Sequence, residues 1–423
     1  MLFRSAEAEP LFQKALLLYQ RLLGEEHPNV AMIYNNLAEL YHDQGRYKEA
    51  ESLHKKVLSL RQRLLGEEHP HVAMSYNNLA FLYKSQGRYA EAEPLFQKAL
   101  ELSIKLLGEE HPDVATSYNN LAVICRCQGR YAEAEPLFQK ALELRQSLLG
   151  EENLSVAASY NDLAELYYYQ GQYTEAEPLF QKALSLYQRL LGEDNLIVAK
   201  ICGNLALLYE SQGRYTEAEP LFQQALELRQ RLLGEEHPYV ADSYNNLAGL
   251  YNSQGRYTEA EPLFQKALEL RQRLLGEEHP DVANSYNNLA ALYESQGRYT
   301  EVEPLYQKAL KLCQRLLGED HPHIATIYSG LAGLYKSQGR YTEAESLFQK
   351  ALELRQRLLG EEHPDVATSY NNLATLYDLQ GRYTQAEHLY QKALAIIEQQ
   401  LGTEHPNTIT VRNNLEYLRN KMG

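Results

Sequence analysis

Eight His-Pro pairs lie near acidic residues, and histidine beside a carboxylate is a combination that serves acid–base catalysis and metal binding. The pairs recur at steps of 42 residues or multiples of 42, from His27-Pro28 to His405-Pro406. A catalytic site is not usually copied once per repeat, and Asn153-Leu154 and Asn195-Leu196 replace the pair at two places. Asparagine is a good N-cap, and proline suits the first turn of a helix. We therefore interpret these pairs as helix start signals.

The remaining reactive side chains also favour a structural interpretation. Cys125, Cys127, Cys202 and Cys313 show no CxxC spacing and are too few for a disulfide framework, so we expect reduced thiols. Cys125 and Cys202 stand at tyrosine positions of the repeat and are expected to pack in the core. The sequence contains no HExxH, phosphate-loop or GxGxxG motif. It therefore predicts no enzymatic activity, no metal and no cofactor.

Adjacent asparagines are the polar feature that recurs most regularly. Asparagine costs roughly 0.5 kcal/mol relative to alanine inside a helix, so another interaction must offset this cost. The amides could form a ladder that offers donors and acceptors to an extended peptide, or they could bond between neighbouring helices or persist from recent duplication. We expect some of them to contact a peptide, with one member of a pair structural where the other faces the ligand. The candidate residues are Asn35, Asn36, Asn77, Asn78, Asn119, Asn120, Asn161, Asn204, Asn245, Asn246, Asn287, Asn288, Asn371 and Asn372.

A repeating element must position these residues, because all 15 prolines of the 423-residue chain fall at two phases of the 42-residue period. In the unit 257–298, apolar residues recur at helical spacing from Tyr257 to about Leu275, which predicts an amphipathic helix. We call this segment helix B. Thr258 and Glu261 have the spacing of a capping box. Pro262 lies on the polar side of the first turns and predicts a loosened first turn.

The second helix of the unit, which we call helix A, is expected from about Pro280 to Gln296. Its predicted buried stripe contains Val282, Tyr286, Leu289, Ala290 and Tyr293. The opposite arc carries Asn284, Asn287, Asn288, Ala291, Glu294 and Ser295. Neither helix can bury its stripe alone. The sequence therefore predicts an all-α solenoid in which hairpins of two helices stack on one another.

Composition excludes several classes of function. With 41 basic and 56 acidic residues the net charge is −15, which opposes broad contact with nucleic acid or anionic lipid. No apolar stretch reaches the roughly 20 residues of a membrane helix, and the first residues do not resemble a signal peptide. We expect a soluble, cytoplasmic protein that binds neither nucleic acid nor membrane.

The phases of the repeat divide the chain into three parts. Residues 1–24 correspond to a helix B without its helix A, residues 25–402 to nine units of helices A and B, and residues 403–423 to a terminal capping helix A. The first helix is expected to expose Ala8, Leu11, Phe12, Ala15 and Leu16. Either preceding residues or another molecule would cover them. Head-to-tail self-association through this uncapped helix is the sharper form of the second alternative.

The segment NLAALYESQGRYTEVEPLYQKAL, residues 288–310, resembles the tetratricopeptide repeat, with Leu289 and Ala290 at its Leu-Gly pair and Tyr293 and Tyr299 at its tyrosines. The 42-residue length and the EAEPLFQKALELRQRLLGEEHPDVA and YNNLA segments are similar to the kinesin light chain type. The resemblance implies a right-handed superhelix whose concave groove is lined by helix A. It also implies a scaffold that binds an extended peptide or partner segment. The heptad region that joins a light chain to its motor is missing, so motor transport is not inferred.

Specificity is expected at groove positions that vary between repeats. Phe81 with Lys84 and Val123 with Arg126 combine apolar and basic side chains without acidic groove neighbours, which suits a bulky apolar anchor beside an acid. The acidic groove residues Asp162, Glu165, Glu210, Asp242 and Glu294 would repel such a ligand. Two alternatives remain open: a self-associating structural rod, and a sensor or docking segment of a larger signalling protein.

Overall fold

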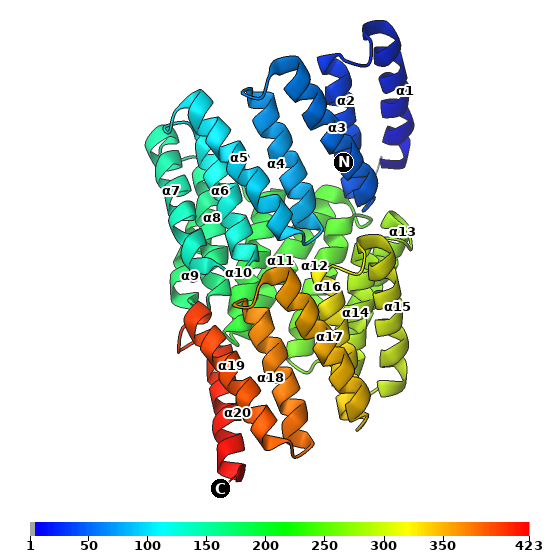
Figure 1. Cartoon of the computed structure of the whole chain (residues 1–423), viewed down its shortest axis with the longest axis vertical. Coiled ribbons are helices and arrows are strands. Elements are labelled where there is room, and N and C mark those ends of the chain that lie inside the picture. The colour runs from blue at the N-terminus through cyan, green and yellow to red at the C-terminus, as the bar shows by residue number, and fades with distance from the viewer. Residues whose placement is uncertain (1–4, 423) are drawn as a thin grey trace. The chain divides into compact units, whose positions relative to one another are not determined.

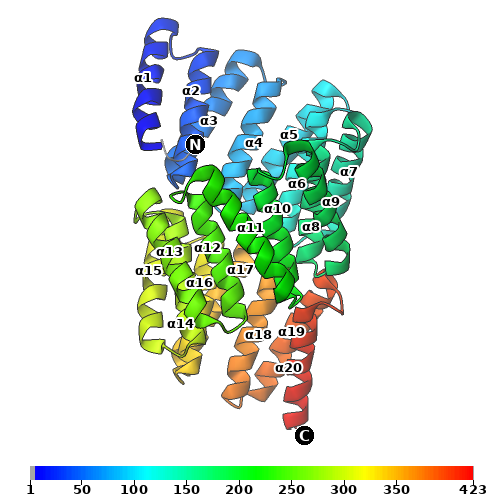
Figure 2. The same ribbon diagram turned by 180° about the vertical axis from the view of Figure 1, so that it is seen from behind.

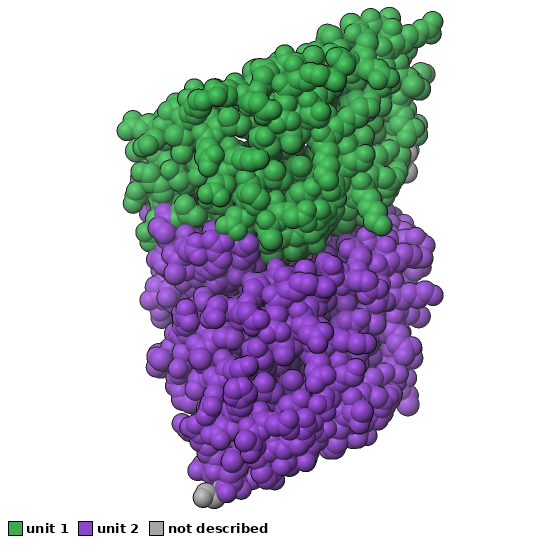
Figure 3. Space-filling view, viewed as in Figure 1, with its two compact units in different colours: residues 1–124, 137–150 green, residues 125–136, 151–423 purple. Residues whose placement is uncertain are grey.

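The computed structural model describes residues 5–422, with side chains from residue 8 onward, and these residues form twenty α-helices and no strand. Residues 1–4 and 423, which belong to the first and last predicted parts, lie outside the described residues. The chain forms two compact units, coloured separately in Figure 3. Unit 1 comprises residues 1–124 and 137–150, and unit 2 comprises residues 125–136 and 151–423.

The helices alternate between types A and B in chain order, as Figure 1 and Figure 2 show. The A helices are α2 (Pro28–Asp43), α4 (Pro70–Ser85), α6 (Pro112–Cys127), α8 (Leu154–Tyr169), α10 (Leu196–Ser211), α12 (Pro238–Ser253), α14 (Pro280–Ser295), α16 (Pro322–Ser337), α18 (Pro364–Leu379) and α20 (Pro406–Met422). The B helices are α1 (Ser5–Leu23), α3 (Tyr47–Leu65), α5 (Tyr89–Leu107), α7 (Tyr131–Leu149), α9 (Tyr173–Leu191), α11 (Tyr215–Leu233), α13 (Tyr257–Leu275), α15 (Tyr299–Leu317), α17 (Tyr341–Leu359) and α19 (Tyr383–Leu401). Helices that follow one another pack together from α1 to α5 in unit 1 and from α8 to α20 in unit 2, which confirms the predicted all-α solenoid.

The His-Pro pairs begin the A helices, as predicted. His69 is the N-cap of α4, and its Nδ1 atom accepts a hydrogen bond from the backbone N–H of His71 at 3.1 Å. Asn153 performs the same task for α8, where its Oδ1 atom accepts from the N–H of Ser155 at 2.8 Å. Each such cap satisfies one of the unpaired amides at a helix start. The histidines therefore serve the backbone, and the acid–base interpretation is not needed to explain them.

The B helices begin differently from the sequence-based expectation. The N-cap of α13 is Arg256, which makes no side-chain cap bond, and Thr258 already lies inside the helix. The predicted capping box of Thr258 and Glu261 is therefore wrong, because the helix starts two residues too early for threonine to cap it. Pro262 is accommodated within a continuous helix.

Each unit has an apolar core of alanines, leucines and aromatic rings. In unit 1, Ala80 of α4 and Phe96 of α5 are at most 1% exposed and belong to one core cluster. In unit 2, Cys202 is completely buried and Cys125 is 3% exposed, which confirms their expected packing role. The predicted stripe of α14 is buried except for the half-buried Tyr286.

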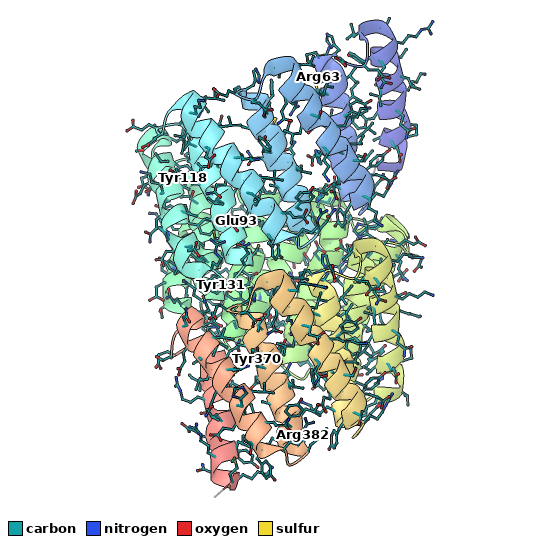
Figure 4. All side chains as sticks on the ribbon, viewed as in Figure 1. Arg63, Glu93, Tyr118, Tyr131, Tyr370 and Arg382 are labelled. Atoms are coloured by element: carbon teal, nitrogen blue, oxygen red, sulfur yellow. The ribbon has the colours of Figure 1, made fainter. Side chains whose placement is uncertain are left out.

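A polar contact that recurs at the end of the hairpin turns joins successive hairpins. In unit 1, Tyr83 Oη and Arg88 Nη1 donate to the two carboxylate oxygens of Glu51 at 3.1 and 2.6 Å, and the guanidinium lies 4.0 Å from the centre of the Tyr83 ring. In unit 2, Arg382, which is labelled in Figure 4, makes the corresponding contacts with Tyr377 and Glu345. Planar stacking and bidentate pairing are contacts that arginine makes better than lysine. These contacts explain why the Gln-Gly-Arg-Tyr segment recurs.

Helix α1 is covered on one side only. Leu11, Leu18 and Leu22 are 67%, 49% and 76% exposed, whereas Leu60, the equivalent of Leu18 in the next B helix, is 5% exposed. The predicted exposure is thus correct for Leu11. It is wrong for Ala8, Phe12, Ala15 and Leu16, which are half-buried, the last three against the core cluster of unit 1.

Candidate functional site

The asparagine pairs connect successive A helices. The second member of a pair donates its side-chain N–H to Oδ1 of the first member one repeat earlier, over 2.7–3.0 Å. The four bonds run from Asn78 to Asn35, Asn204 to Asn161, Asn288 to Asn245 and Asn414 to Asn371. The expectation of a ladder of spare amides therefore needs correction, because part of the hydrogen-bonding capacity is used inside the stack, where it offsets the poor helix propensity of asparagine.

Burial divides the candidate asparagines into three groups. Asn36 is exposed and makes no side-chain hydrogen bond to the described residues. Asn119, Asn120 and Asn161 are 9%, 9% and 3% exposed, which leaves them little surface for a ligand. The half-buried group contains Asn35, Asn77, Asn78, Asn204, Asn245, Asn246, Asn287, Asn288, Asn371 and Asn372.

Phe81 and Lys84 lie together on α4 in unit 1. The Phe81 ring is 39% exposed and rests edge-on against Phe96, with 5.1 Å between ring centres. Lys84 Nζ lies 5.2 Å from the centre of the Phe81 ring, a cation–π distance. Among the described residues Lys84 makes no ion pair. This part of the candidate site presents an apolar anchor point beside an uncompensated positive charge.

Arg126 is in a different situation, and the expectation that it has no acidic neighbour is wrong. Its Nη1 atom donates to Oε2 of Glu165 at 2.6 Å, and the two side chains are only 14% and 22% exposed. Glu165 also accepts from the amides of Asn161 and Asn204 at 3.0 and 3.1 Å. Burial acts to raise the pKa of Glu165, but Arg126 and Asn161 outweigh it, so this pKa lies below its usual value. Positions 126 and 165 belong to neighbouring repeats, and the sequence alone did not pair them.

Other acidic residues of the predicted groove are also engaged. Glu210 accepts from Ser253 Oγ at 2.8 Å, Glu294 accepts from Tyr306 Oη at 3.3 Å, and Asp242 pairs with Arg271 at 2.6 Å. Burial raises the pKa of both Glu210 and Glu294. These contacts reduce the negative field that the sequence assigned to the later repeats.

One feature of α4 was not recognised in the sequence. Asn77 Oδ1 is buried and has no hydrogen-bond partner among the described residues, and Asn77 lines a cavity with Met74, Ser103 and Ser117. The sequence indicates such a cavity, because the small Ser103 side chain stands where the preceding repeat has the much larger Arg61.

No group of three or more histidine, cysteine, aspartate or glutamate residues in the region 5–422 is arranged to hold a metal ion. Over the same region, no helix has the length and apolar character needed to cross a membrane.

The comparisons with known proteins agree with the repeat geometry. The tetratricopeptide repeat model matches residues 2–63, 30–101, 71–147, 113–189, 155–230, 198–257, 239–314, 281–341, 323–399 and 379–423. No curated protein matches the sequence.

Solved structures show the same fold. The chain is similar to nearly identical tetratricopeptide-like repeats of a putative kinesin light chain from Podosopora anserina, at 28% identity over 49% of this chain and 98% of that one, with a TM-score of 0.41. A Rap protein complexed with Competence and Sporulation Factor is 16% identical over 88% of this chain and 98% of that one, with a TM-score of 0.60. A human IFIT1 dimer with PPP-AAAA is 21% identical over 97% of this chain and 84% of that one, with a TM-score of 0.52.

The family matches overlap along the chain from residue 2 to residue 423, so together they cover every hairpin described above. The family that the sequence resembled is thereby confirmed. Repeats of this kind support a role as a protein-interaction scaffold. The chain belongs to the tetratricopeptide repeat family.

Proposed function

We propose that this chain is a non-catalytic scaffold that binds an extended peptide segment of a partner protein along its A helices. The α4 face of unit 1, which we define by Asn77, Phe81 and Lys84, is the principal contact. The observation that carries the proposal is the exposed Phe81 ring beside Lys84, which has no ion pair among the described residues.

The chemistry of the α4 face favours a particular ligand. An apolar side chain can pack on the Phe81 ring, and an acidic side chain next to it can pair with Lys84. The half-buried amides would then bond the peptide backbone with whatever donors and acceptors the contacts between repeats leave unused. Such a surface combines sequence-tolerant backbone contacts with one specific anchor.

The structural neighbours are compatible with this role. The Rap protein, which has the same fold, was solved in a complex with Competence and Sporulation Factor. Low identity limits that comparison to the fold, so the assignment of the ligand rests on Phe81 and Lys84.

A peptide display library tests the proposal. Linear random peptides selected on the full chain should be enriched in an aromatic or large aliphatic residue next to aspartate or glutamate. Their binding should weaken at least tenfold in Lys84→Glu, measured by fluorescence anisotropy. The single change is preferable to one that includes Arg126, because Arg126 holds the buried ion pair with Glu165. Unchanged binding of all selected peptides in Lys84→Glu would refute this placement.

Self-association through α1 is a second candidate, favoured by the exposed Leu11, Leu18 and Leu22. It would place α20 of a second copy against α1. Glu416 weakens this candidate, because it stands on α20 where the preceding A helix has the buried Ala374. Light scattering at increasing concentration tests it, and a monomer at high concentration argues against it.

A further inference from the structure

A cavity of about 210 Å³ lies between α4 and α6 in unit 1. Met74 and Asn77 of α4, Ser103 of α5, and Thr116 and Ser117 of α6 line it. Ser103 and Ser117 are 7% and 3% exposed, whereas Met74 is 49% exposed. The cavity therefore has a buried polar floor and a rim open to solvent.

An arginine fills the equivalent space in four other repeats. Arg61 donates from Nη1 to Ser75 Oγ at 2.9 Å and to the carbonyl oxygen of His71 at 3.1 Å. The same guanidinium-to-serine bond, each 2.7 Å long, joins Arg229 to Ser243, Arg271 to Ser285 and Arg355 to Ser369. Arg271 and Arg355 are only 7% and 8% exposed, so the fold seats a guanidinium here as an interior group.

The residue types at the two positions vary together along the chain. Arginine on helix B is followed fourteen residues later by serine, as in Arg61 and Ser75, whereas tyrosine, cysteine or isoleucine is followed by isoleucine or valine. The arginine–serine pairs are 61 with 75, 145 with 159, 229 with 243, 271 with 285 and 355 with 369, and the apolar pairs are 19 with 33, 187 with 201, 313 with 327 and 397 with 411. Ser103 and Ser117 are the exception. Ser117 stands where the serine accepts a hydrogen bond from arginine in other repeats, but Ser103 replaces that arginine.

The groups that would bind that arginine are still in place. Ser117 Oγ and the carbonyl oxygen of Asp113 correspond to the acceptors used by Arg61, and Asn77 Oδ1 adds a buried acceptor without a partner. In the part of the chain that the structure describes, no lysine, arginine or histidine lines the cavity. A buried acceptor without a partner costs free energy that an incoming donor recovers. We propose that this cavity is a specificity pocket for an arginine side chain of the bound peptide, whose guanidinium replaces the one that the repeat lacks.

A neighbouring positive charge does not exclude this occupant. Arg145 reaches the rim, where its Nη2 atom lies 3.4 Å from Thr116 Oγ1. The chain itself seats guanidinium groups in consecutive repeats, at Arg229 and Arg271. The net charge of −15 and the carboxylate of Asp113 at the mouth favour a cation further.

The pocket deepens the proposed function and rests on it for its biological ligand. Met74 and Asn77 lie on the arc of α4 that also carries Phe81 and Lys84, and ten residues separate Met74 from Lys84, roughly 15 Å along a helix. A peptide that places an arginine in the pocket would therefore put its apolar and acidic residues several positions away, at Phe81 and Lys84. The α4 face would then bind both a basic and an acidic side chain of the same peptide.

Methionine methyl NMR on the full chain tests the pocket with N-acetyl-arginine amide as the probe. The chain has four methionines, and Met32 occupies the position of Met74 in the preceding repeat, where Arg61 fills the space. The probe should shift the Met74 methyl signal saturably and leave Met32 unchanged. The uncharged citrulline analogue should shift neither signal. Equal shifts with citrulline, or no shift of Met74, would overturn the proposal.

Two substitutions should fill the cavity beside Met74 and empty the equivalent space beside Met32, which Arg61 occupies. Ser103→Arg should fold, because five other repeats carry arginine at this position, and it should abolish the Met74 shift. Arg61→Ser should open a matching cavity and make Met32 respond. A Met74 shift that persists in Ser103→Arg would also overturn the proposal. If selected peptides bind Ser103→Arg as well as wild type while Lys84→Glu weakens them, the pocket is refuted and the proposed function stands.

Discussion

The α4 face of unit 1 and the Arg126–Glu165 cluster of unit 2 use the same repeat positions in opposite ways. Phe81 and Lys84 leave an apolar ring and a positive charge facing solvent. In the cluster, Arg126, Glu165, Asn161 and Asn204 satisfy one another over 2.6–3.1 Å. The difference shows that groove composition alone does not identify a binding residue. A charged side chain is available to a ligand only where the next repeat does not supply its partner.

The largest expected effect on stability is that of acid on a buried histidine in the core of unit 1. His54 on α3 of unit 1 is 2% exposed and stands where unit 2 has Phe180, Phe222 and Phe264. Burial, together with the charges of His42 and Arg61, lowers the pKa of His54 to about 4. The half-exposed carboxylate of Glu39, 3.7 Å away, does not offset that burial.

The sign of the effect follows from linkage. The unfolded chain binds this proton near pH 6.5, and the folded chain binds it only near pH 4. The neutral His54 side chain stabilises the folded state fully above pH 6.5. This stabilisation is lost as the pH falls toward 4, and the free energy of unfolding decreases by about 3 kcal/mol in total. Urea unfolding of wild type and His54→Phe between pH 7.5 and 4 measures it. The variant should lose less stability in acid, and parallel pH curves would contradict this account.

Breaking the Arg126–Glu165 pair should have the next largest effect. Glu165→Ala leaves a buried guanidinium without its partner and should lower the free energy of unfolding by about 3 kcal/mol. Lys84→Ala, the control on the α4 face, should change it by less than about 0.5 kcal/mol. Urea denaturation of both variants gives the comparison. Equal losses of unfolding free energy in the two variants would mean that Lys84 also makes a stabilising contact within the fold, and would contradict this account.

Substituting two of the asparagines should change the free energy of unfolding by smaller amounts. Asn204→Ala should lower it, and Asn36→Ala should raise it. Asn204→Ala removes the bonds to Asn161 and Glu165 and should cost about 1 kcal/mol. Asn36→Ala loses no such bond and should stabilise α2 by about 0.5 kcal/mol through helix propensity. Hydrogen exchange of the A helices reports both changes. Destabilisation by Asn36→Ala would show that its amide has a structural partner.

The sequence predicts most of the fold because the period constrains it strongly. The bounds predicted for α13 agree with the structure, and those for α14 agree to within one residue, since glycine and the His-Pro pair mark the helix ends. The capping box failed because capping depends on which residue is the first outside the helix. That boundary is set by the turn that carries Arg256 and not by the spacing of Thr258 and Glu261.

The candidate site was less predictable because its contacts join different repeats. The bond from Asn78 to Asn35 spans 43 residues, and the pair of Arg126 with Glu165 spans 39. The helical pattern within a single repeat does not show which residues of neighbouring repeats come into contact. Comparing the same position across all repeats would have revealed the arginine that is missing at Ser103.

The affinity of selected peptides for two matched double variants tests the central claim most directly. Phe81→Ala with Lys84→Ala removes the α4 anchor, and Leu207→Ala with Glu210→Ala changes the same repeat positions in unit 2. The account predicts a loss of at least thirtyfold, about 2 kcal/mol, for the first variant and less than twofold for the second. Similar losses in both variants, or none in the first, would contradict the claim that the α4 face holds the peptide.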